Sequence, residues 1–181
     1  MRRVSVVGSS GSGKTTLARR LSERLGVEHV ELDALYHGPG WTEPDPEDFR
    51  GRVREALADA GDGWVCCGNY SMAVPSVVWP IADTVVVLDL PRATVMRRVV
   101  ARTLRRVLTR EELWNGNREP FRNLYAWDPE RNITRWAWVR HDLYHDRYRH
   151  AAADPAWAHL DFVFLSSPRQ VDEFGATFGL S

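Results

Sequence analysis

Short apolar runs alternate with longer segments of helical spacing along the 181 residues of the chain. The short runs predict strands, because they are rich in β-branched residues and are bounded by glycine, proline or aspartate. Five such strands are expected, at residues 3–7, 27–32, 63–68, 83–90 and 159–165. The fourth run is almost continuously apolar, which is typical of a strand that is covered on both faces.

Between these runs, apolar residues recur every three or four positions and predict helices. The first helix follows a glycine-rich loop and is expected to end at Gly26, because glycine suits the left-handed residue that closes many helices. Further helices are expected at about residues 46–61, 91–108, 128–152 and 168–178. Strands that alternate with helices in this way predict a three-layer α/β/α fold around a mostly parallel sheet.

Composition and charge narrow the class of protein. The 24 basic and 24 acidic residues cancel, so the chain has no overall field that would attract nucleic acid or an acidic membrane. No apolar run approaches the roughly 20 residues that cross a bilayer. The first apolar run leads into a glycine-rich loop and not into a signal-peptide cleavage site. We therefore expect a single cytoplasmic domain over residues 1–181, as a monomer or homodimer, with no membrane partner.

The cysteines and histidines show no metal-site pattern. Cys66 and Cys67 are neighbours in a predicted strand, so their side chains point to opposite faces and we expect reduced core thiols. His141, His145 and His150 lie in one tryptophan-rich helix, without the cysteine or carboxylate spacing of a zinc site. We expect these histidines to be surface or half-buried residues and the tryptophans to be packing residues.

The strongest motif lies between the first predicted strand and the first predicted helix. GSSGSGKT, residues 8–15, fits the phosphate-loop pattern G-x-x-x-x-G-K-[ST] in full, so backbone N–H groups and a helix N-terminus are expected to hold the phosphates of a nucleoside triphosphate. Lys14 is the only lysine in the chain, and its compact ammonium suits a position between the β- and γ-phosphates better than a guanidinium would. The Thr15 hydroxyl is expected to complete the shell of a Mg²⁺ ion; a glycine-rich turn without a ligand is the weaker alternative. The nucleotide-binding residues expected from this motif are Gly8, Ser9, Ser10, Gly11, Ser12, Gly13, Lys14, Thr15 and Thr16.

In its order of elements the chain resembles the adenylate kinase-like family of phosphate-loop kinases. The segment LDLPRATVMRRVVAR, residues 88–102, is similar to the approach to that family's lid: a strand ends in an acid, a proline opens a helix, and two arginines stand four apart. The resemblance implies a five-stranded parallel sheet in the order 2-3-1-4-5, an acceptor-binding insertion at about 34–62 and a helical lid at about 109–125. It also implies ATP as the phosphate donor with Mg²⁺, Arg98 against the adenine side of the nucleotide, and Arg102 at its phosphates.

Arginines cluster on the helix that leads into the expected lid. Helical spacing places Arg98, Arg102 and Arg105 on one face, which would spread positive charge over a transferring phosphoryl group. Arg102 is therefore a candidate catalytic residue, together with Lys14. The alternative is a solvated basic face that makes no contact with a nucleotide.

The residues expected to face the phosphate acceptor depart from the pattern of nucleoside monophosphate kinases. In kinases of that kind the third strand ends in an Asp-Gly pair, and an arginine that holds the acceptor phosphate follows within three residues. The chain has CCGNYS instead, with Cys67 at the place of the aspartate and Ser71 at the place of the arginine. Without such cations an anionic acceptor would be poorly held, so an acceptor that offers a hydroxyl group is favoured.

Acidic residues end two of the predicted strands. Glu31 and Asp33 stand two apart in ELD and are expected on one face of an extended segment, at the sheet edge where ligands bind in open α/β folds. They resemble the acids with which shikimate- and gluconate-type kinases bind magnesium waters and the acceptor hydroxyl. Asp33 is therefore the candidate catalytic base or acceptor anchor, with a helix N-cap as the alternative, and Glu31 is a candidate metal-site residue. Asp89 is either a Walker B acid or a structural acid.

The stretches LDALYHGPGW, CCGNYS and LWNGNREPF resemble a bacterial group labelled topology modulation protein or adenylate kinase-related. Asn69 and Tyr70 follow Gly68 at a strand end, so these residues are expected to line the acceptor pocket. Trp41 is either a wall of that pocket or a loop anchor, and Asn117 also lies in one of the shared stretches. The substrate-binding residues expected on this basis are Asp33, His37, Trp41, Gly68, Asn69 and Tyr70.

Two classes of function follow from the sequence. The first is an ATP- and Mg²⁺-dependent kinase that transfers the γ-phosphoryl group to a small acceptor, with a hydroxyl compound favoured over a nucleoside monophosphate. The second is an ATP-binding regulatory protein that acts on nucleic acid, as the label of the bacterial group suggests. The balanced charge and the lack of a separate basic domain argue against the second, because duplex binding needs several cations on one surface.

Overall fold

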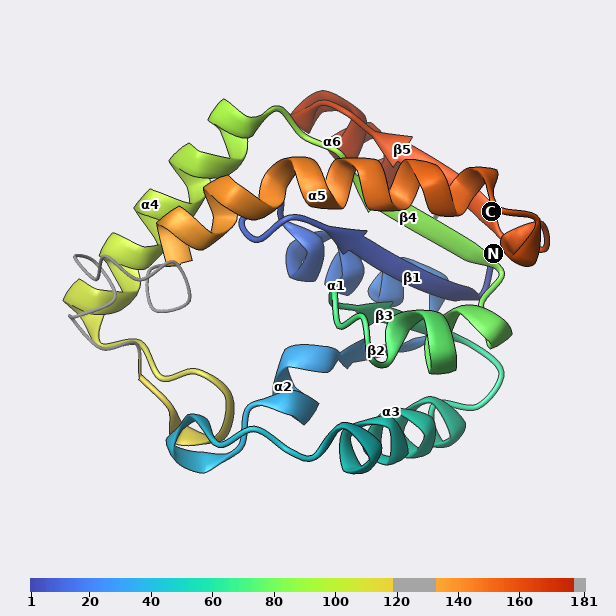
Figure 1. Ribbon diagram of the computed structural model, residues 1–181, viewed down its shortest axis with the longest axis horizontal. Helices are drawn as coiled ribbons and strands as arrows, with labels where there is room; N and C mark the ends of the chain where they lie inside the picture. Colours follow the sequence, from blue (N-terminus) through green and yellow to red (C-terminus); the bar gives the residue numbers. More distant parts are fainter. Residues whose placement is uncertain (119–132, 178–181) are drawn as a thin grey trace.

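The five apolar runs form one parallel sheet, as their alternation with helical segments predicts (Figure 1). The computed structural model describes residues 1–118 and 133–177. The strands are β1 (Arg3–Gly8), β2 (Glu28–Glu31), β3 (Trp64–Cys67), β4 (Thr84–Leu88) and β5 (Asp161–Leu165). Neighbouring strands are parallel in the order β2-β3-β1-β4-β5, which confirms the expected fold class and strand order.

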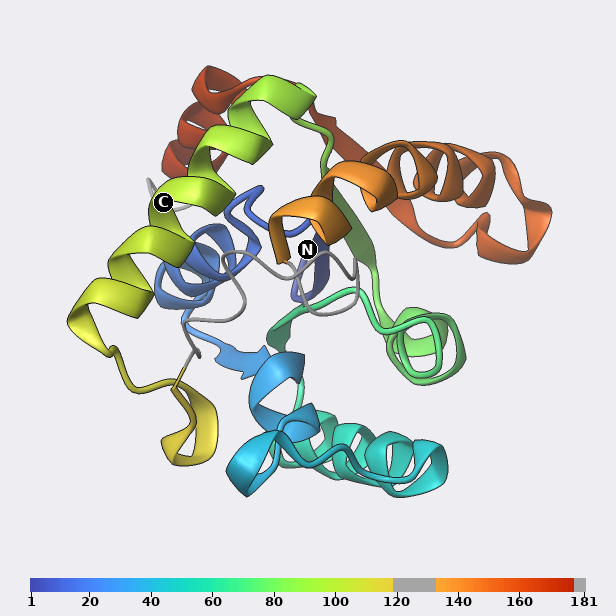
Figure 2. The same ribbon diagram turned by 60° about the vertical axis from the view of Figure 1, so that its left-hand side comes forward.

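Helices cover both faces of this sheet (Figures 1 and 2). The longer helices are α1 (Lys14–Leu25), α3 (Pro46–Asp59), α4 (Arg92–Thr109), α5 (Ile133–Ala153) and α6 (Pro168–Thr177). The short helical turns are α2 (Leu32–Tyr36), η1 (Pro39–Trp41), η2 (Val74–Val78), η3 (Trp79–Ile81), η4 (Trp114–Gly116) and η6 (Pro155–Trp157). Buried side chains of α1, α4 and α6 pack against one face, and those of α3, α5, η2 and η3 pack against the other, which gives the three expected layers.

Side chains of the central strands alternate between the two cores. Val6 of β1 and Cys67 of β3 point into the core that contains α1, whereas Val7 and Cys66 point into the core that contains α3. Both cysteines are buried free thiols, as predicted, and burial raises the pKa of each.

Most observed boundaries agree with the predicted ones to within a few residues. The start expected for α5 at residue 128 and the end expected for α6 at residue 178 lie outside the described residues. None of the helices that the structure describes is both long enough and apolar enough to cross a membrane.

The segment expected to form the lid is described in part. Helix α4 ends at Thr109, and Arg110 follows with a left-handed φ of 50°. The chain then forms a loop around η4, closed by a single antiparallel bridge between Glu112 and Arg118. Residues 119–125 of the expected lid lie outside the described residues.

The chain departs from the predicted extended conformation directly after β2. Strand β2 ends at Glu31 and helix α2 follows, so the expectation that Glu31 and Asp33 share one face of an extended segment is wrong. Leu32 is fully buried against the end of β3, where a Cβ atom on Gly68 would lie only 2.7 Å from the Cβ atom of Leu32. The missing side chain of Gly68 therefore lets the helical turn begin inside the core.

Candidate active site

The phosphate loop connects β1 to α1 and curls around the side chain of its lysine. Lys14 Nζ donates hydrogen bonds to the carbonyl oxygens of Gly8 (2.9 Å) and Ser9 (3.1 Å). Burial lowers the pKa of Lys14 below that of an ordinary lysine, and the nearby Asp33 carboxylate opposes this shift. The ammonium is thus held inside the loop, where the motif predicts the phosphates.

The conformation of the loop suits an anion. Gly11 has a φ of 81°, and a Cβ atom there would lie 2.4 Å from Cγ2 of Val99, so only glycine lets α4 pack directly on the loop. Gly13 precedes α1, whose first turn carries Thr15 and the exposed Thr16 but no acid. The hydroxyl of Ser12 is buried and has no hydrogen-bond partner among the described residues. These features fit phosphate oxygens at the N-terminus of α1.

Two of the three predicted arginines reach the loop from α4. Arg98 Nη1 donates to the carbonyl oxygen of Ser12 (2.9 Å), and Arg102 Nη2 donates to the hydroxyl of Ser10 (3.0 Å). Arg105 instead forms an ion pair with Glu111, at 2.9 Å. Of the three arginines predicted to share one helix face, Arg98 and Arg102 therefore contact the phosphate loop. Arg105 makes its ion pair outside the loop.

Oxygen groups that fit a Mg²⁺ ion lie beside the lysine. Thr15 Oγ1 donates to Glu31 Oε1 at 3.1 Å. Cys67 Sγ lies 3.9 Å from the same hydroxyl, and burial, reinforced by the charge of Glu31, raises the pKa of this thiol to about 12, so the sulfur is neutral. No group of three or more His, Cys, Asp or Glu residues in the described part of the chain could hold a metal. This donor set fits Mg²⁺, which is commonly bound by one or two protein oxygens together with substrate phosphates.

Asp33 lies next to this site, although α2 and not β2 carries it. Tyr70 donates its phenolic hydrogen to Asp33 Oδ1 at 2.7 Å, and the Tyr70 oxygen is 3.5 Å from Nε2 of His37. Burial and the Asp33 charge raise the pKa of Tyr70, while burial lowers the pKa of His37. Asp33 is not the N-cap of α2, because Glu31 occupies that position. The structure thus brings Asp33, Tyr70 and His37 together, as the sequence predicts. Helix α2, and not an extended strand, carries Asp33 to this position.

Asn69 joins the phosphate loop to both β3 and α5. Its Oδ1 accepts hydrogen bonds from the backbone N–H of Gly8 (3.1 Å) and from the hydroxyl of Tyr148 (3.0 Å), and its Nδ2 donates to the Gly8 carbonyl. The sequence placed Asn69 in the acceptor pocket but gave no sign of its bonds to Gly8. Tyr144 and Tyr148 stand four residues apart and therefore lie on one face of α5. This spacing is the feature of the sequence that could have indicated that α5 also faces the site.

The described part of the expected lid is bound to the loop that follows α2. Asn117 is buried, accepts from the Trp41 backbone N–H (3.0 Å) and donates to the Gly38 carbonyl (2.9 Å). The His37 ring lies between Trp41, at 5.2 Å, and Trp114, at 5.6 Å between ring centroids. Trp41 has a left-handed φ of 62°, and its indole donates to a lid carbonyl, so it anchors the loop to the lid.

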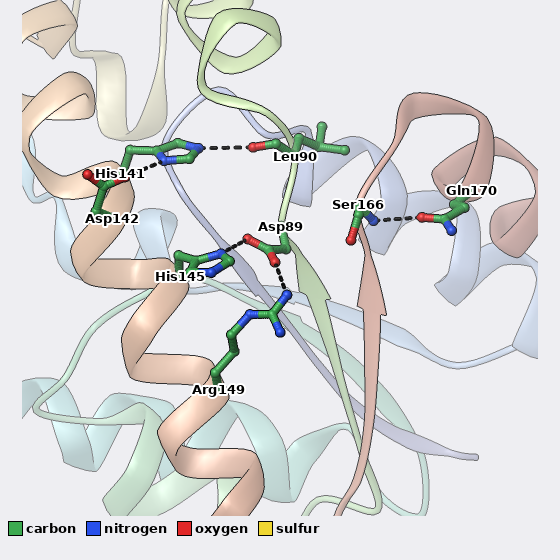
Figure 3. Close-up of polar contacts among 8 residues, drawn as sticks. All are labelled: Asp89, Leu90, His141, Asp142, His145, Arg149, Ser166 and Gln170. Atoms are coloured by element: carbon green, nitrogen blue, oxygen red, sulfur yellow. Dashed lines mark hydrogen bonds and ion pairs between the residues drawn. The ribbon is translucent and has the colours of Figure 1, made fainter.

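Asp89, which follows β4, is bound by α5. Its carboxylate accepts from His145 Nδ1 (2.6 Å) and Arg149 Nη2 (3.1 Å), as Figure 3 shows. Of the two roles expected for Asp89, this pairing favours the structural acid. Gln170 lies across the sheet edge, where its side chain accepts from the Ser166 backbone N–H at 2.7 Å.

Comparison with known proteins places the chain in a family. The family described as AAA domain matches residues 4–120. The chain is 35% identical over 115 residues to a shikimate kinase of Mycobacterium leprae, covering 57% of each protein. It is 36% identical over 80 residues to a bifunctional pantoate ligase/cytidylate kinase of Gloeobacter violaceus, covering 42% of this chain and 15% of that protein. The chain thus spans about half or less of the length of these curated relatives.

A solved structure supports the fold. A sugar kinase from Janibacter sp. superimposes with a TM-score of 0.51 at 22% identity, covering 98% of this chain and 94% of that one. At this identity the likeness concerns the fold alone. The family match covers more than half of the residues, and the sheet order and phosphate loop agree with it. The chain therefore belongs to the AAA domain family, among the adenylate kinase-like P-loop proteins.

Proposed function

We propose that the chain is an ATP- and Mg²⁺-dependent kinase that transfers the γ-phosphoryl group of ATP to a hydroxyl group of a small acceptor. The observation that carries the proposal is the phosphate loop, in which Lys14 Nζ is held by the Gly8 and Ser9 carbonyl oxygens while the charge of the Asp33 carboxylate acts on the same ammonium. A cation for the transferred group and a proton acceptor for the attacking hydroxyl are the two charges that this reaction needs. The similarity to a shikimate kinase supports the same class.

Each residue of the site has a role in this proposal. The acceptor oxygen forms a bond to the γ-phosphorus, the bond from that phosphorus to the bridging oxygen of ADP breaks, and the hydroxyl proton passes to Asp33. Tyr70, which donates to Asp33, holds the carboxylate in place. Lys14 and Arg102 balance the charge of the phosphates, and Arg98 lies toward the base of the nucleotide. Thr15 and Glu31 are the residues that would hold Mg²⁺, which would supply further positive charge when bound.

A nucleoside monophosphate is the second candidate for the acceptor. The similarity to a protein named as a cytidylate kinase favours it. Against it, Cys67 is a neutral thiol and Ser71 is an exposed hydroxyl at the two positions where such kinases carry an aspartate and an arginine.

We also propose that one domain contains the acceptor-binding insertion at 34–62 and the lid at 109–125.

The experiment that tests the function measures ADP release with single candidate acceptors. Shikimate, gluconate, adenosine, AMP and CMP are each added to the protein with MgATP, and the phosphorylated product is identified by mass spectrometry. A phosphorylated hydroxyl compound supports the proposal, and a nucleoside diphosphate from AMP or CMP supports the second candidate. Slow hydrolysis that no acceptor stimulates, combined with retention on duplex DNA, would instead support a regulatory protein.

A further inference from the structure

The ring of His37 is held by aromatic side chains from three segments of the chain. Tyr36 of α2 and Trp41 of η1 meet it edge to face, each at 5.2 Å between ring centroids. Trp114 of η4 stacks on it at 5.6 Å, with an angle of 29° between the two planes. These contacts restrict the ring, whose Nε2 atom lies 3.5 Å from the Tyr70 hydroxyl oxygen.

The segment around Trp114 holds the backbone of His37 as well as its ring. We call residues 112–118 the η4 loop, and Figures 1 and 2 show this loop beside α2 and η1. Asn115 Nδ2 in the η4 loop donates a hydrogen bond to the carbonyl oxygen of His37. The guanidinium of Arg106 on α4 lies 5.8 Å from the Trp114 ring centroid, so α4 supports the tryptophan from outside the loop.

Tyr70 connects His37 to the proposed base. Its phenolic hydrogen is donated to Asp33 Oδ1 at 2.7 Å, and burial together with the Asp33 charge raises the pKa of Tyr70, so the phenol keeps this hydrogen. Toward His37 the Tyr70 oxygen can therefore act only as an acceptor, and the donor is an N–H at Nε2 of the imidazole. At 3.5 Å this contact is long and weak. The Tyr70 ring also packs against Tyr36 (4.5 Å) and Phe49 (5.0 Å), so its hydroxyl has little room to leave Asp33.

We propose that His37 is a positioning residue: the η4 loop fixes His37, and His37 in turn keeps the Tyr70 hydroxyl on the Asp33 carboxylate. The proposal rests on the proposed kinase function, in which Asp33 takes the proton of the attacking hydroxyl. The sequence predicts His37 as a substrate-binding residue, whereas its contacts with Tyr70 and Trp114 give it an effect on the reaction through Asp33. A base held in place favours transfer, because proton transfer requires a precise hydrogen-bond geometry.

The first test separates kcat from KM, with the acceptor that the wild-type protein phosphorylates. His37→Ala should lower kcat about 3- to 10-fold, the effect of one weak hydrogen bond, and leave KM for the acceptor and for ATP unchanged. His37→Gln, whose amide N–H can take the place of Nε2, should recover most of this loss. The control is Arg118→Ala, which truncates an exposed side chain of the η4 loop and should behave as the wild type.

Double variants show whether the contacts act in one chain. Tyr70→Phe removes the oxygen that His37 contacts, so the addition of His37→Ala should lower kcat no further. Trp114→Leu removes the stacked ring and should lower kcat in the wild type, but not in His37→Ala. Falls in kcat that multiply in these double variants would overturn the proposal.

An NMR measurement tests the same contacts without any transfer. Carboxyl ¹³C signals of the aspartates are recorded in the protein without ligands, and that of Asp33 is assigned from the spectrum of Asp33→Asn. We expect His37→Ala and Trp114→Leu each to shift the Asp33 signal, and Arg118→Ala to leave it in place.

The kinetic and NMR results distinguish the positioning role from the proposed function. If His37→Ala raises KM for the acceptor at an unchanged kcat, His37 binds the acceptor directly, so the positioning role is overturned and the kinase proposal stands. Unchanged kcat and KM overturn the positioning role in the same way. If the Asp33 signal shifts but no acceptor is phosphorylated, the positioning of Asp33 is supported while the kinase proposal fails. An Asp33 signal that neither His37→Ala nor Trp114→Leu shifts overturns the positioning role.

Discussion

The proposed nucleotide side and the proposed acceptor side of the sheet edge are built in different ways. The nucleotide side is a continuous loop of small residues, in which backbone groups and Lys14 provide the contacts. The acceptor side is assembled from side chains of separate segments, such as Asp33, Tyr70 and Asn117. The first arrangement is local in sequence and the second depends on contacts made across the fold. The difference teaches that one motif can predict where a nucleotide binds, whereas a prediction of the acceptor site depends on the whole chain.

Among the changes that act on one side of the site alone, the largest effect is expected from Lys14→Arg. The variant should lower phosphoryl transfer about 100- to 1,000-fold with every acceptor, because one preorganised charge at a reacting group contributes that much and a guanidinium does not fit the loop. The measurement is the initial rate of ADP release at saturating acceptor. Arg105→Ala is the control, since its guanidinium pairs with Glu111 outside the loop. Unchanged turnover in Lys14→Arg would remove the lysine from the transfer step.

The next largest effect is expected in the chemical labelling of Lys14 with an amine-reactive reagent. Lys14 is the only lysine in the chain, so its labelling can be followed without interference from other lysines. Its pKa is lowered from the usual value of 10.5 by burial, so at about pH 8.5 more of it is the reactive neutral amine than in an ordinary lysine. Peptide mass spectrometry should find that MgATP slows the labelling of Lys14 about 10-fold or more. Labelling that MgATP does not slow would contradict a phosphate contact at this position.

Asn117→Ala tests the acceptor side with a smaller effect. The variant leaves the Trp41 N–H and the Gly38 carbonyl without the partner they have in the fold, which should lower the free energy of unfolding by about 1–3 kcal/mol. Urea denaturation measures this change, and Arg118→Ala, which truncates an exposed side chain of the same loop, is the control. ATP affinity should stay the same. If Asn117→Ala lowers the affinity for ATP as much as the affinity for the acceptor, the two sides do not bind their ligands independently.

The smallest effect is expected from the protonation of His37. Burial lowers its pKa, so the folded state resists protonation, and the stability present above about pH 6.5 is lost as the pH falls below that value. Tm should therefore fall more between about pH 7.5 and about pH 5.5 in the wild type than in His37→Gln. His29 also has a pKa lowered by burial, so both proteins are compared in a His29→Gln background. An equal fall in Tm would show that His37 does not contribute.

The parts of the fold that the sequence predicted are those set by local patterns. Apolar runs located the five strands, and the phosphate-loop motif placed Lys14 and Thr15 correctly at the start of α1, directly after the loop that follows β1. A helix after β2 was predicted only as the alternative in which Asp33 is its N-cap, and its observed start depends on the burial of Leu32 against Gly68, which lies 36 residues further along the chain. No pattern of neighbouring residues carries that information.

The site was predicted less completely than the fold for the same physical reason. Arg98 and Arg102 reach the phosphate loop as their helical spacing suggests, but Arg105 finds Glu111 instead. The bonds of Asn69 to Gly8, and the network of Asp89 with α5, join segments that are 56 to 61 residues apart. Such contacts follow from strand order and helix placement, so they became visible only in the folded chain.

Asp33→Asn is the variant that most directly tests the proposed transfer between the two sides. ATP affinity and the rate of transfer are measured on the same preparation. We expect the affinity for MgATP to be retained and the rate of transfer to fall about 100- to 10,000-fold, because the amide cannot accept the hydroxyl proton. Tyr70→Phe, which removes the hydrogen bond to Asp33 but keeps the carboxylate, should give a smaller fall in rate. Transfer at the wild-type rate in Asp33→Asn would contradict the role of Asp33 as the base beside Lys14.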